Sequence, residues 1–262
     1  MIHNLTNIHP NAKIGNNVHI DAFTSIEEDV IIGDGCWISS NVTIMNGARI
    51  GNNVKIFPGA VISAIPQDLK YKGEKTFAKI GDNTIIREYV TINKGTTANM
   101  ETVVGSDCLL MAYVHVAHDC IVGNHCILAN CATLAGHITI DDWAIIGGLS
   151  AVHQFVNIGS HTMISGGSLV SKDVPPFVKA AREPLSYVGI NSVGLQRRGF
   201  TPETINQIQD IYRKLFVSNL SVSNAIIEIE KNVKKSPERD QILQFIAKSE
   251  RGIMKGYKGG SE

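Results

Sequence analysis

The residues of this chain best suited to acid–base chemistry are a histidine and an aspartate that stand side by side, His118 and Asp119. They lie in an otherwise aliphatic and repetitive stretch, with His115 three residues before His118. Histidine is the side chain whose ordinary pKa lies near neutral pH, so it can accept and return a proton there. The pair therefore predicts an enzyme whose general base is His118, beside a carboxylate.

The element that must position this pair is a repeat of six residues. Every sixth residue from Ile8 to Val170 is Ile, Leu or Val, apart from Asp68, Glu74 and Ala98. Neither a strand, with a period of two residues, nor a helix, with a period of 3.6, sustains such a pattern. Repeats of six are typical of a parallel β-helix, in which the chain winds as a solenoid. The predicted fold is therefore an all-β solenoid over this part of the chain.

Two further columns of the repeat support the solenoid. Four residues after each aliphatic position comes a small or β-branched residue, and turn-forming Gly, Asn and Asp stand between, as in Gly33-Asp34-Gly35. These residues tolerate the backbone angles of a tight corner. Each hexad is then one flat side and one corner, and three hexads make a triangular coil of 18 residues. The cysteines occupy or adjoin the small inward column, which favours packing over metal binding: Cys36, Cys108, Cys120, Cys126 and Cys131.

The coil length predicts which residues stack on His118. Residues 18 apart lie on neighbouring coils, about 4.8 Å apart, the spacing of strands in a sheet. Gly136 then lies over His118, and His137 lies over Asp119. His153 follows His118 by 35 residues, one fewer than two coils, so it lies at the same corner two coils further on. Gly136 has no side chain, so its N–H can approach a developing oxyanion. Three histidines on one edge favour a catalytic site over a solvated ladder, with direct attack by a substrate hydroxyl and no covalent intermediate.

Two interruptions and a change of pattern complete the predicted domain organisation. The hexads break near 64–79 and 98–103 and resume in phase, which predicts surface loops, with Asp68 and Lys70 in the first. A β-helix is expected over 1–185 and an α-helical domain over 186–262. Within that domain we expect helices from Thr201-Pro202, from Ser223 to Lys235 and from Pro237 to Lys255, then a frayed end from Gly256.

Composition and charge exclude several classes of function. Lys plus Arg and Asp plus Glu both number 24, so no net charge attracts nucleic acid or a membrane surface. No aliphatic run approaches the roughly 18 residues of a membrane span, and no signal peptide is recognisable. Five cysteines without a secretory signal fit reduced thiols, so we expect a cytoplasmic protein.

Several motifs resemble the UDP-N-acetylglucosamine O-acyltransferases, a family of hexapeptide-repeat enzymes. They are the segments 67–74, 116–120, 128–130, 151–155, 173–176 and 194–200. The resemblance implies a left-handed β-helix and a homotrimer with its sites in clefts between neighbouring solenoids. It also implies transfer of a 3-hydroxyacyl group from acyl carrier protein to the glucosamine 3-hydroxyl of UDP-N-acetylglucosamine. That reaction is the first step of lipid A biosynthesis and uses no cofactor or metal.

The same resemblance implies roles for individual residues. His118 matches the family's general base, Asp119 its partner, and Gly136 the backbone donor to the thioester oxyanion. Gly166 matches the position that sets the depth of the acyl groove, which predicts long donors. Contacts to the sugar or nucleotide are matched by Asp68, His137, Gln154, Asn191, Arg197 and Arg198, and other cleft residues by Lys70, His115 and His153. The chain departs from the relatives' polar nucleotide contacts at Pro184 and Val193.

Three other interpretations remain open at this stage. The later N-acyltransferase of the same pathway is also a hexapeptide trimer, but it carries an extra domain before the solenoid, whereas here the hexads begin at Ile8. A zinc enzyme of the carbonic anhydrase type would hold its metal between subunits on three histidines. A non-catalytic scaffold would not require His118, Asp119 and Gly136 to coincide on one corner.

Overall fold

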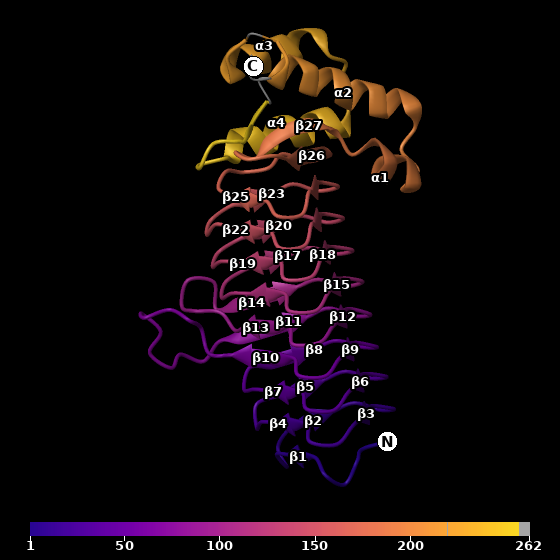
Figure 1. Cartoon of the computed structure of the whole chain (residues 1–262), viewed down its shortest axis with the longest axis vertical. Helices are drawn as coiled ribbons and strands as arrows, with labels where there is room; N and C mark the ends of the chain where they lie inside the picture. The colour runs from indigo at the N-terminus through magenta and orange to yellow at the C-terminus, as the bar shows by residue number, and fades with distance from the viewer. Residues whose placement is uncertain (219, 257–262) are drawn as a thin grey trace.

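The computed structural model describes residues 1–218 and 220–256, and these form a tall three-sided solenoid with helices stacked on its C-terminal end (Figure 1). Three sheets make the sides. The first sheet contains β1 (Asn7–Ile8), β4 (Ser25–Ile26), β7 (Thr43–Ile44), β10 (Val61–Ala64), β13 (Thr91–Asn93), β16 (His115–Val116), β19 (Thr133–Leu134), β22 (Ala151–Val152) and β25 (Leu169–Val170). The predicted parallel β-helix is thus confirmed.

The other two sheets follow the same order along the chain. The second sheet contains β2 (Lys13–Ile14), β5 (Ile31–Ile32), β8 (Ala48–Ile50), β11 (Phe77–Ile80), β14 (Glu101–Val104), β17 (Ile121–Val122), β20 (Thr139–Ile140) and β23 (Asn157–Ile158). The third sheet contains β3 (His19–Ile20), β6 (Trp37–Ile38), β9 (Lys55–Ile56), β12 (Ile85–Ile86), β15 (Leu109–Leu110), β18 (Ile127–Leu128), β21 (Ile145–Ile146) and β24 (Met163–Ile164). We call the turns from first to second sheet the first corner, from second to third the second corner, and from third to first the third corner.

The hexad aliphatics form the core of the solenoid. The second residue of each two-residue strand points inward, and Ile38, Ile56 and Leu128 are fully buried in stacked rows. Burial of one such side chain contributes about 1.5–3 kcal/mol. Because Ile8 pairs with Ile26, the matching residue of the next coil, each coil places its aliphatic residue directly on that of the coil before.

The corners are held by hydrogen bonds between coils. At the second corner the side-chain oxygen of one coil accepts the backbone N–H of the coil before it: Asn52 Oδ1 accepts from Asp34 (2.9 Å) and Asp82 Oδ1 from Asn52 (2.7 Å). The same ladder runs along the edge with amides and carboxylates alternating, through Asn16, Asp34, Asn52 and Asp82 and again at Asn124 and Asp142. Four cysteines are buried as expected, namely Cys36, Cys108, Cys120 and Cys126, whereas Cys131 beside them is half-buried. Cys126 Sγ donates to the Asp141 carbonyl oxygen at 3.3 Å.

Two insertions interrupt the first corner. Val61 pairs with Thr91 and Thr91 pairs with His115, and both steps are longer than the regular step from one coil to the next. The extra residues form the loop 65–76 and the turn 94–100, which leave the solenoid on the left in Figure 1. The sequence placed the second break at 98–103, which is wrong at its end, because Glu101 to Val103 belong to β14 and pair with β11.

The C-terminal segment closes the solenoid. The strands β26 (Val178–Ala181), β27 (Ser186–Ile190) and β28 (Lys255–Gly256) extend the third sheet, and four helices cover that end: α1 (Ser192–Arg197), α2 (Pro202–Phe216), α3 (Val222–Asn232) and α4 (Pro237–Lys248). The expected start of α2 is confirmed, with the Thr201 hydroxyl capping its first turn. No helix in the described part of the chain is long and apolar enough to cross a membrane.

Three expectations for this segment were wrong. The short helix α1 was not predicted, and α4 ends at Lys248 rather than Lys255, because Ser249 is extended and its hydroxyl donates to the buried Asp173 carboxylate at 2.6 Å. The helix expected to reach Lys235 ends at Asn232. Gly256, expected to be frayed, pairs with Tyr187 in β28, and the rest of that expected end, 257–262, lies outside the described residues.

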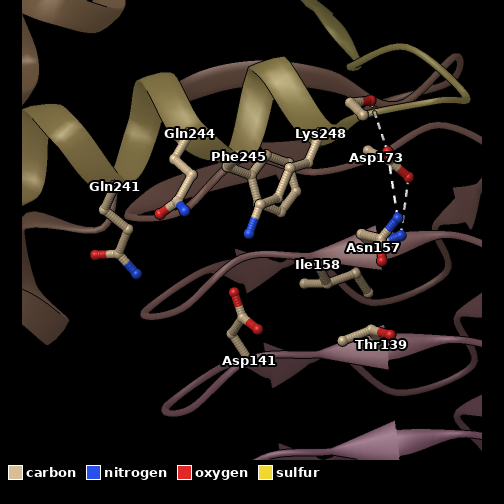
Figure 2. A pocket seen from close by; sticks show the side chains of 10 residues that line it. Thr139, Asp141, Asn157, Ile158, Asp173, Gln241, Gln244, Phe245 and Lys248 are labelled. Atoms are coloured by element: carbon tan, nitrogen blue, oxygen red, sulfur yellow. Dashed lines mark hydrogen bonds between the residues drawn. The ribbon is translucent and has the colours of Figure 1, made fainter.

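The contact between α4 and the solenoid leaves a cavity of about 350 Å³. Gln241, Gln244 and Lys248 project from α4 into this cavity and face Asp141 at the second corner of the solenoid (Figure 2). Asp173 anchors the far end, where it accepts the Asn157 N–H at 2.8 Å (Figure 2). The C-terminal helices are therefore joined to the solenoid in two ways, by polar contacts around α4 and by apolar side chains that extend the core of the solenoid.

The corner ladder generates a prediction for stability. In Asn52→Ala the Asp34 N–H loses its protein acceptor, which should lower the free energy of unfolding by about 1 kcal/mol. For a chain of this size the melting temperature should fall by about 2–4 °C. Calorimetry measures this against Lys55→Ala, an exposed change on a flat side, which should melt like the parent protein. Equal melting of Asn52→Ala and the parent would show that the ladder does not contribute.

Candidate active site

The first corner carries the predicted acid–base pair. Residues 117–120 join β16 to β17, and Asp119 takes a positive φ of 59°, which lets its side chain and that of His118 both leave the solenoid. His137 and Phe155 occupy the same position one and two coils on, with φ of 61° and 65°. The rings of His137 and Phe155 stack with centroids 4.7 Å apart. The constant coil length therefore produces a column of corner side chains that point out of the solenoid.

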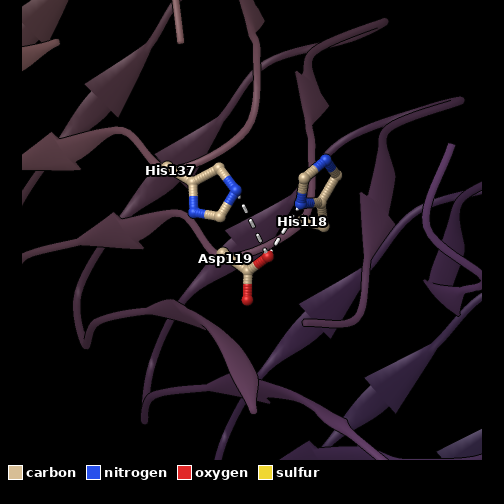
Figure 3. Close-up of side chains that lie close together, drawn as sticks. All are labelled: His118, Asp119 and His137. Atoms are coloured by element: carbon tan, nitrogen blue, oxygen red, sulfur yellow. Dashed lines mark hydrogen bonds and ion pairs between the residues drawn. The ribbon is translucent and has the colours of Figure 1, made fainter. Parts of the chain in front are cut away.

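His118 and Asp119 form a hydrogen-bonded dyad (Figure 3). The Nδ1 atom of His118 lies 2.7 Å from Asp119 Oδ2, and because an ionised carboxylate only accepts, Nδ1 carries the proton. The other ring nitrogen, Nε2, points away from Asp119 and keeps its lone pair (Figure 3). The His118 side chain is 13% exposed, so this lone pair sits at the surface of a largely buried ring. Such a histidine can act as a base.

The Asp119 carboxylate is fully enclosed and fully hydrogen-bonded. Oδ1 accepts the N–H of Thr96 (2.9 Å) and of Asn99 (3.2 Å), and Oδ2 accepts the Thr96 hydroxyl (2.7 Å) besides His118. Burial alone would raise the pKa of Asp119, but the hydrogen bonds from Thr96, His118 and Asn99 outweigh it and hold that pKa below its usual value. The carboxylate is therefore charged at neutral pH and can stabilise a protonated His118.

Gly136 lies against the His118 ring, where the stacking of coils placed it. A Cβ atom at Gly136 would stand 2.6 Å from Cε1 and 2.8 Å from Nε2 of His118, so any side chain would displace the imidazole. Among the described residues the N–H of Gly136 has no hydrogen-bond acceptor. The glycine therefore makes room for the base and leaves an amide free beside it.

The remaining predicted residues of this edge lie on β16, on a later coil of the first corner and in the loop 65–76. His115 lies on β16 just before it, and its Nδ1 is 2.7 Å from the Thr91 hydroxyl; burial, and then the charge of His118, lower the pKa of His115. His153 and Gln154 are exposed two coils on, and His153 Nδ1 donates to the Gln154 carbonyl at 3.1 Å. The loop 65–76 contains the predicted site residues Asp68 and Lys70. The Asp68 carboxylate accepts the N–H of Lys70 at 2.9 Å, and the Lys70 side chain is exposed.

Of the predicted nucleotide contacts, Gln154 lies at the first corner, whereas Asn191, Arg197 and Arg198 lie on a different edge. Asn191 caps α1 and donates to the His161 carbonyl oxygen at 2.9 Å, and the Arg198 guanidinium lies 5.4 Å from the Trp143 ring, so this group sits at the second corner. Arg197 ends α1, on the right in Figure 1, opposite the loops of the first corner. Trp143 belongs to the same coil as His137, so both edges carry their polar groups at one height.

Two nitrogen atoms of Arg198 lack a partner. Nε and Nη2 are buried, and no hydrogen bond to either is formed within the described part of the chain. Val193 on α1 and Pro184, the two positions where the sequence analysis expects a departure from relatives, are both exposed. Gly166 lies at the third corner, where a Cβ would meet the Gly148 carbonyl oxygen at 3.0 Å. Within a single subunit, Arg198 and Gly166 therefore lie on different edges of the solenoid from His118.

Comparison with known proteins agrees with this geometry. A family model described as UDP-N-acetylglucosamine O-acyltransferase, domain 2, matches residues 173–254, and a bacterial transferase hexapeptide model matches 11–44, 29–64 and 101–136. An acyl-(acyl-carrier-protein)–UDP-N-acetylglucosamine O-acyltransferase of Herminiimonas arsenicoxydans is 44% identical over 260 residues, 97% of this chain and 99% of that protein. The chain belongs to the UDP-N-acetylglucosamine O-acyltransferases.

Solved structures of that family have the same fold. The UDP-N-acetylglucosamine acyltransferase of Bacteroides fragilis superposes with a TM-score of 0.96 at 52% identity, covering 97% of this chain and 100% of that one. The Acinetobacter baumannii enzyme gives 0.93 at 41% identity, covering 97% and 99%. Because the chain belongs to the O-acyltransferases, the two alternatives of an N-acyltransferase and of a non-catalytic scaffold are disfavoured.

The geometry of this O-acyltransferase also argues against the zinc alternative. His118, Asp119 and His137 offer three ligand atoms within 4.8 Å of one another. However, Nδ1 of His118 and Oδ2 of Asp119 are 2.7 Å apart, whereas two ligands of a tetrahedral zinc ion lie about 3.3 Å apart. All four acceptor positions of the carboxylate are already used. The cluster is built as a hydrogen-bonded dyad.

The sequence analysis missed the residues that hold Asp119. One regular coil back from Asp119 would be Glu101, but the insertion lengthens this coil and brings Thr96 and Asn99 there instead. Thr102, whose hydroxyl accepts the Asp119 N–H at 2.8 Å, was also missed, although it lies on β14 in regular register with β17. Only the length of the break could have indicated Thr96 and Asn99.

His161, between the Asn191 and Arg198 contacts, gives a prediction for acid stability. Burial, and then the charge of Arg198, lower the pKa of His161 from 6.5 to about 4. The unfolded chain takes up this proton near pH 6.5, so the free energy of unfolding should fall as the pH drops from 6.5 towards 4. In His161→Phe, which keeps the stacking on Phe177, this part of the fall should disappear. Urea unfolding at several pH values measures it, and parallel curves for both proteins would contradict the assignment.

Proposed function

We propose that this chain transfers a 3-hydroxyacyl group from acyl carrier protein to the glucosamine 3-hydroxyl of UDP-N-acetylglucosamine, the first step of lipid A biosynthesis. The observation that carries the proposal is the dyad, in which Asp119 holds Nδ1 of His118 and leaves Nε2 free beside the unpaired N–H of Gly136. A relative named as an acyl-(acyl-carrier-protein)–UDP-N-acetylglucosamine O-acyltransferase is 44% identical over nearly the whole chain. The free thiols fit a cytoplasmic location.

The dyad supports direct attack of the sugar hydroxyl on the thioester, by addition and then elimination through a tetrahedral intermediate. Nε2 of His118 takes the proton of the sugar hydroxyl while its oxygen attacks the thioester carbon, and Asp119 stabilises the imidazolium that results. Gly136 N–H donates to the oxyanion of the tetrahedral intermediate. As the intermediate collapses, the new C–O bond remains, the C–S bond breaks, and His118 returns the proton to the carrier thiol.

A covalent acyl-enzyme is not needed for this reaction. The nearest thiol, Cys120, points into the core and donates to the Ala135 carbonyl oxygen at 3.0 Å. Burial raises the pKa of Cys120 to about 12, so it stays protonated and unreactive at neutral pH. The attacking oxygen is therefore that of the substrate.

The substrate contacts are those that the resemblance to the family implies. Near the dyad, Asp68 and His137 contact the sugar, and Lys70, His115 and His153 line the cleft. Gln154, Asn191, Arg197 and Arg198 contact the nucleotide and its phosphates. The support for the phosphate contact is the Arg198 guanidinium, whose buried Nε and Nη2 have no partner among the described residues and can donate to an anion.

The separation of these groups favours a site shared between copies. His137 and the Trp143 ring near Arg198 lie on one coil and Gly166 lies on the next, so an axis parallel to the solenoid would bring these groups of different copies together with little change in height. The third sheet lies between the edges that bear Arg198 and Gly166 and turns apolar residues outward at that level, namely Leu109, Ile127, Ile145 and Met163. We infer a homotrimer in which the first corner of one copy faces the third sheet of the next.

Mixed trimers test the base and the shared site together. His118→Ala should lower kcat by about 100-fold or more, the scale of a lost general base, and Arg198→Ala should also be strongly impaired. A trimer that contains both kinds of subunit has one intact site, so it should regain roughly a third of the parent activity. Differently tagged subunits allow such trimers to be isolated and assayed.

The matched control combines His118→Ala with Asp119→Asn, two changes on one corner. These trimers should stay inactive, because no site then has both residues intact. Recovery in the control, or none in the first mixture, would contradict the shared site. A folded His118→Ala trimer with near-normal turnover would overturn the catalytic assignment itself.

Gly166 generates a prediction for donor length. Without a side chain there the acyl groove stays open, and each buried methylene contributes about 0.8 kcal/mol, so four more contribute roughly 3 kcal/mol, about a hundredfold in specificity. Gly166→Met should shift the preference towards shorter 3-hydroxyacyl donors and leave KM for UDP-N-acetylglucosamine nearly unchanged. A panel of acyl-carrier thioesters measures this, and an unchanged donor profile would place the end of the groove elsewhere.

A further inference from the structure

The turn 94–100 belongs to the catalytic corner although it lies one coil before it. It joins β13 to β14, and the N–H of Met100 donates to the Thr96 carbonyl oxygen at 2.8 Å, which closes the turn on itself. The amide of Asn99 reaches across and donates through Nδ2 to the Asp119 carbonyl oxygen at 3.1 Å. The insertion therefore folds over the next coil and presents its N–H groups to Asp119.

Thr96 is the residue of this turn that binds both carboxylate oxygens. Its N–H donates to Oδ1 of Asp119 at 2.9 Å and its hydroxyl to Oδ2 at 2.7 Å, whereas Asn99 reaches only Oδ1. The hydroxyl oxygen also accepts the N–H of Ala98 at 3.2 Å, so its own proton is left to point at Asp119. Thr96 is 8% exposed, which leaves little room for water to take over these bonds.

A second histidine competes for the same carboxylate oxygen. Nε2 of His137 lies 3.8 Å from Oδ2 of Asp119, too far for a hydrogen bond but within reach of a small rotation of the carboxylate. The Thr96 hydroxyl and the His118 N–H approach Oδ2 together and hold it against that rotation. The dyad geometry therefore depends on a donor from the inserted turn.

We propose that Thr96 is a positioning residue, which fixes the Asp119 carboxylate so that His118 keeps its proton on Nδ1 and its lone pair on Nε2. The kinetic part of this inference rests on the proposed function, because it is measured in the acyl-transfer reaction. The geometric part concerns only the ring of His118. The extra residues of this coil then serve the acid–base pair and do not form a mere surface loop.

The test compares Thr96→Val, which removes only the hydroxyl donor from a residue of the same shape, with Thr96→Ser, which restores it. We expect Thr96→Val to lower kcat by about tenfold or more, the scale of one charge-assisted hydrogen bond, with KM for UDP-N-acetylglucosamine within about twofold. Thr96→Ser should recover most of the loss. Thr97→Val, at the exposed neighbouring position of the turn, is the matched control and should match the parent.

A spectroscopic measurement separates this inference from the proposed function. Nitrogen-15 NMR of the imidazole in the full-length protein, without substrates, should show His118 protonated on Nδ1 at neutral pH in the parent and a mixture of tautomers in Thr96→Val. A parent ring protonated on Nε2 would overturn the inference whether or not the variants fold. A folded Thr96→Val variant with the kcat and the His118 tautomer of the parent would also overturn the inference. If the parent protein showed no acyl transfer at all, only the proposed function would be overturned.

Discussion

The constraint on which the rest of this structure depends is the constant register between coils. Each coil buries its aliphatic residues directly on those of the coil before, and a shift by one residue would turn the buried row outward. Once that row is fixed, every corner position is fixed as well, because a corner residue cannot move along the chain without moving the core. The column of Asp119, His137 and Phe155 exists for this reason, and the room that Gly136 leaves for His118 follows from it. The geometry of the His118–Asp119 dyad thus depends on the packing of the aliphatic rows inside the solenoid.

The same constraint explains what could be predicted from the sequence. Where the coil keeps its regular length, the repeat correctly placed Gly136 beside His118 and His137 beside Asp119. Where the length changes, at the turn 94–100, the repeat gave no indication of Thr96, because the inserted residues are placed by their own hydrogen bonds. The end of α4 was missed for a related reason. Asp173 draws Ser249 into an extended path that no helical pattern records.

The division of polar groups between edges was also outside the reach of periodicity. Arg198 follows the last hexad, and its position over Trp143 depends on how α1 leaves β27 and on the cap formed by Asn191. The resemblance to the family supplied these residues without their location. Only the coordinates show that one chain holds the base on one edge and the guanidinium on another, which makes the three-sided cross-section as important for function as the dyad.

The alternating ladder along the second corner has a consequence for the ageing of the protein. Amides and carboxylates take turns along this edge, from Asn16 and Asp34 through Asn52 to Asp82, so neighbouring coils rarely set two negative charges side by side. Deamidation converts an asparagine into an acidic residue, and at Asn52 it would place three carboxylates in a row at the spacing of strands, about 4.8 Å. Each like-charged pair at such a distance costs about 1 kcal/mol even in water. A slow chemical change on an exposed edge, far from the dyad, would therefore loosen the register that holds the dyad in place.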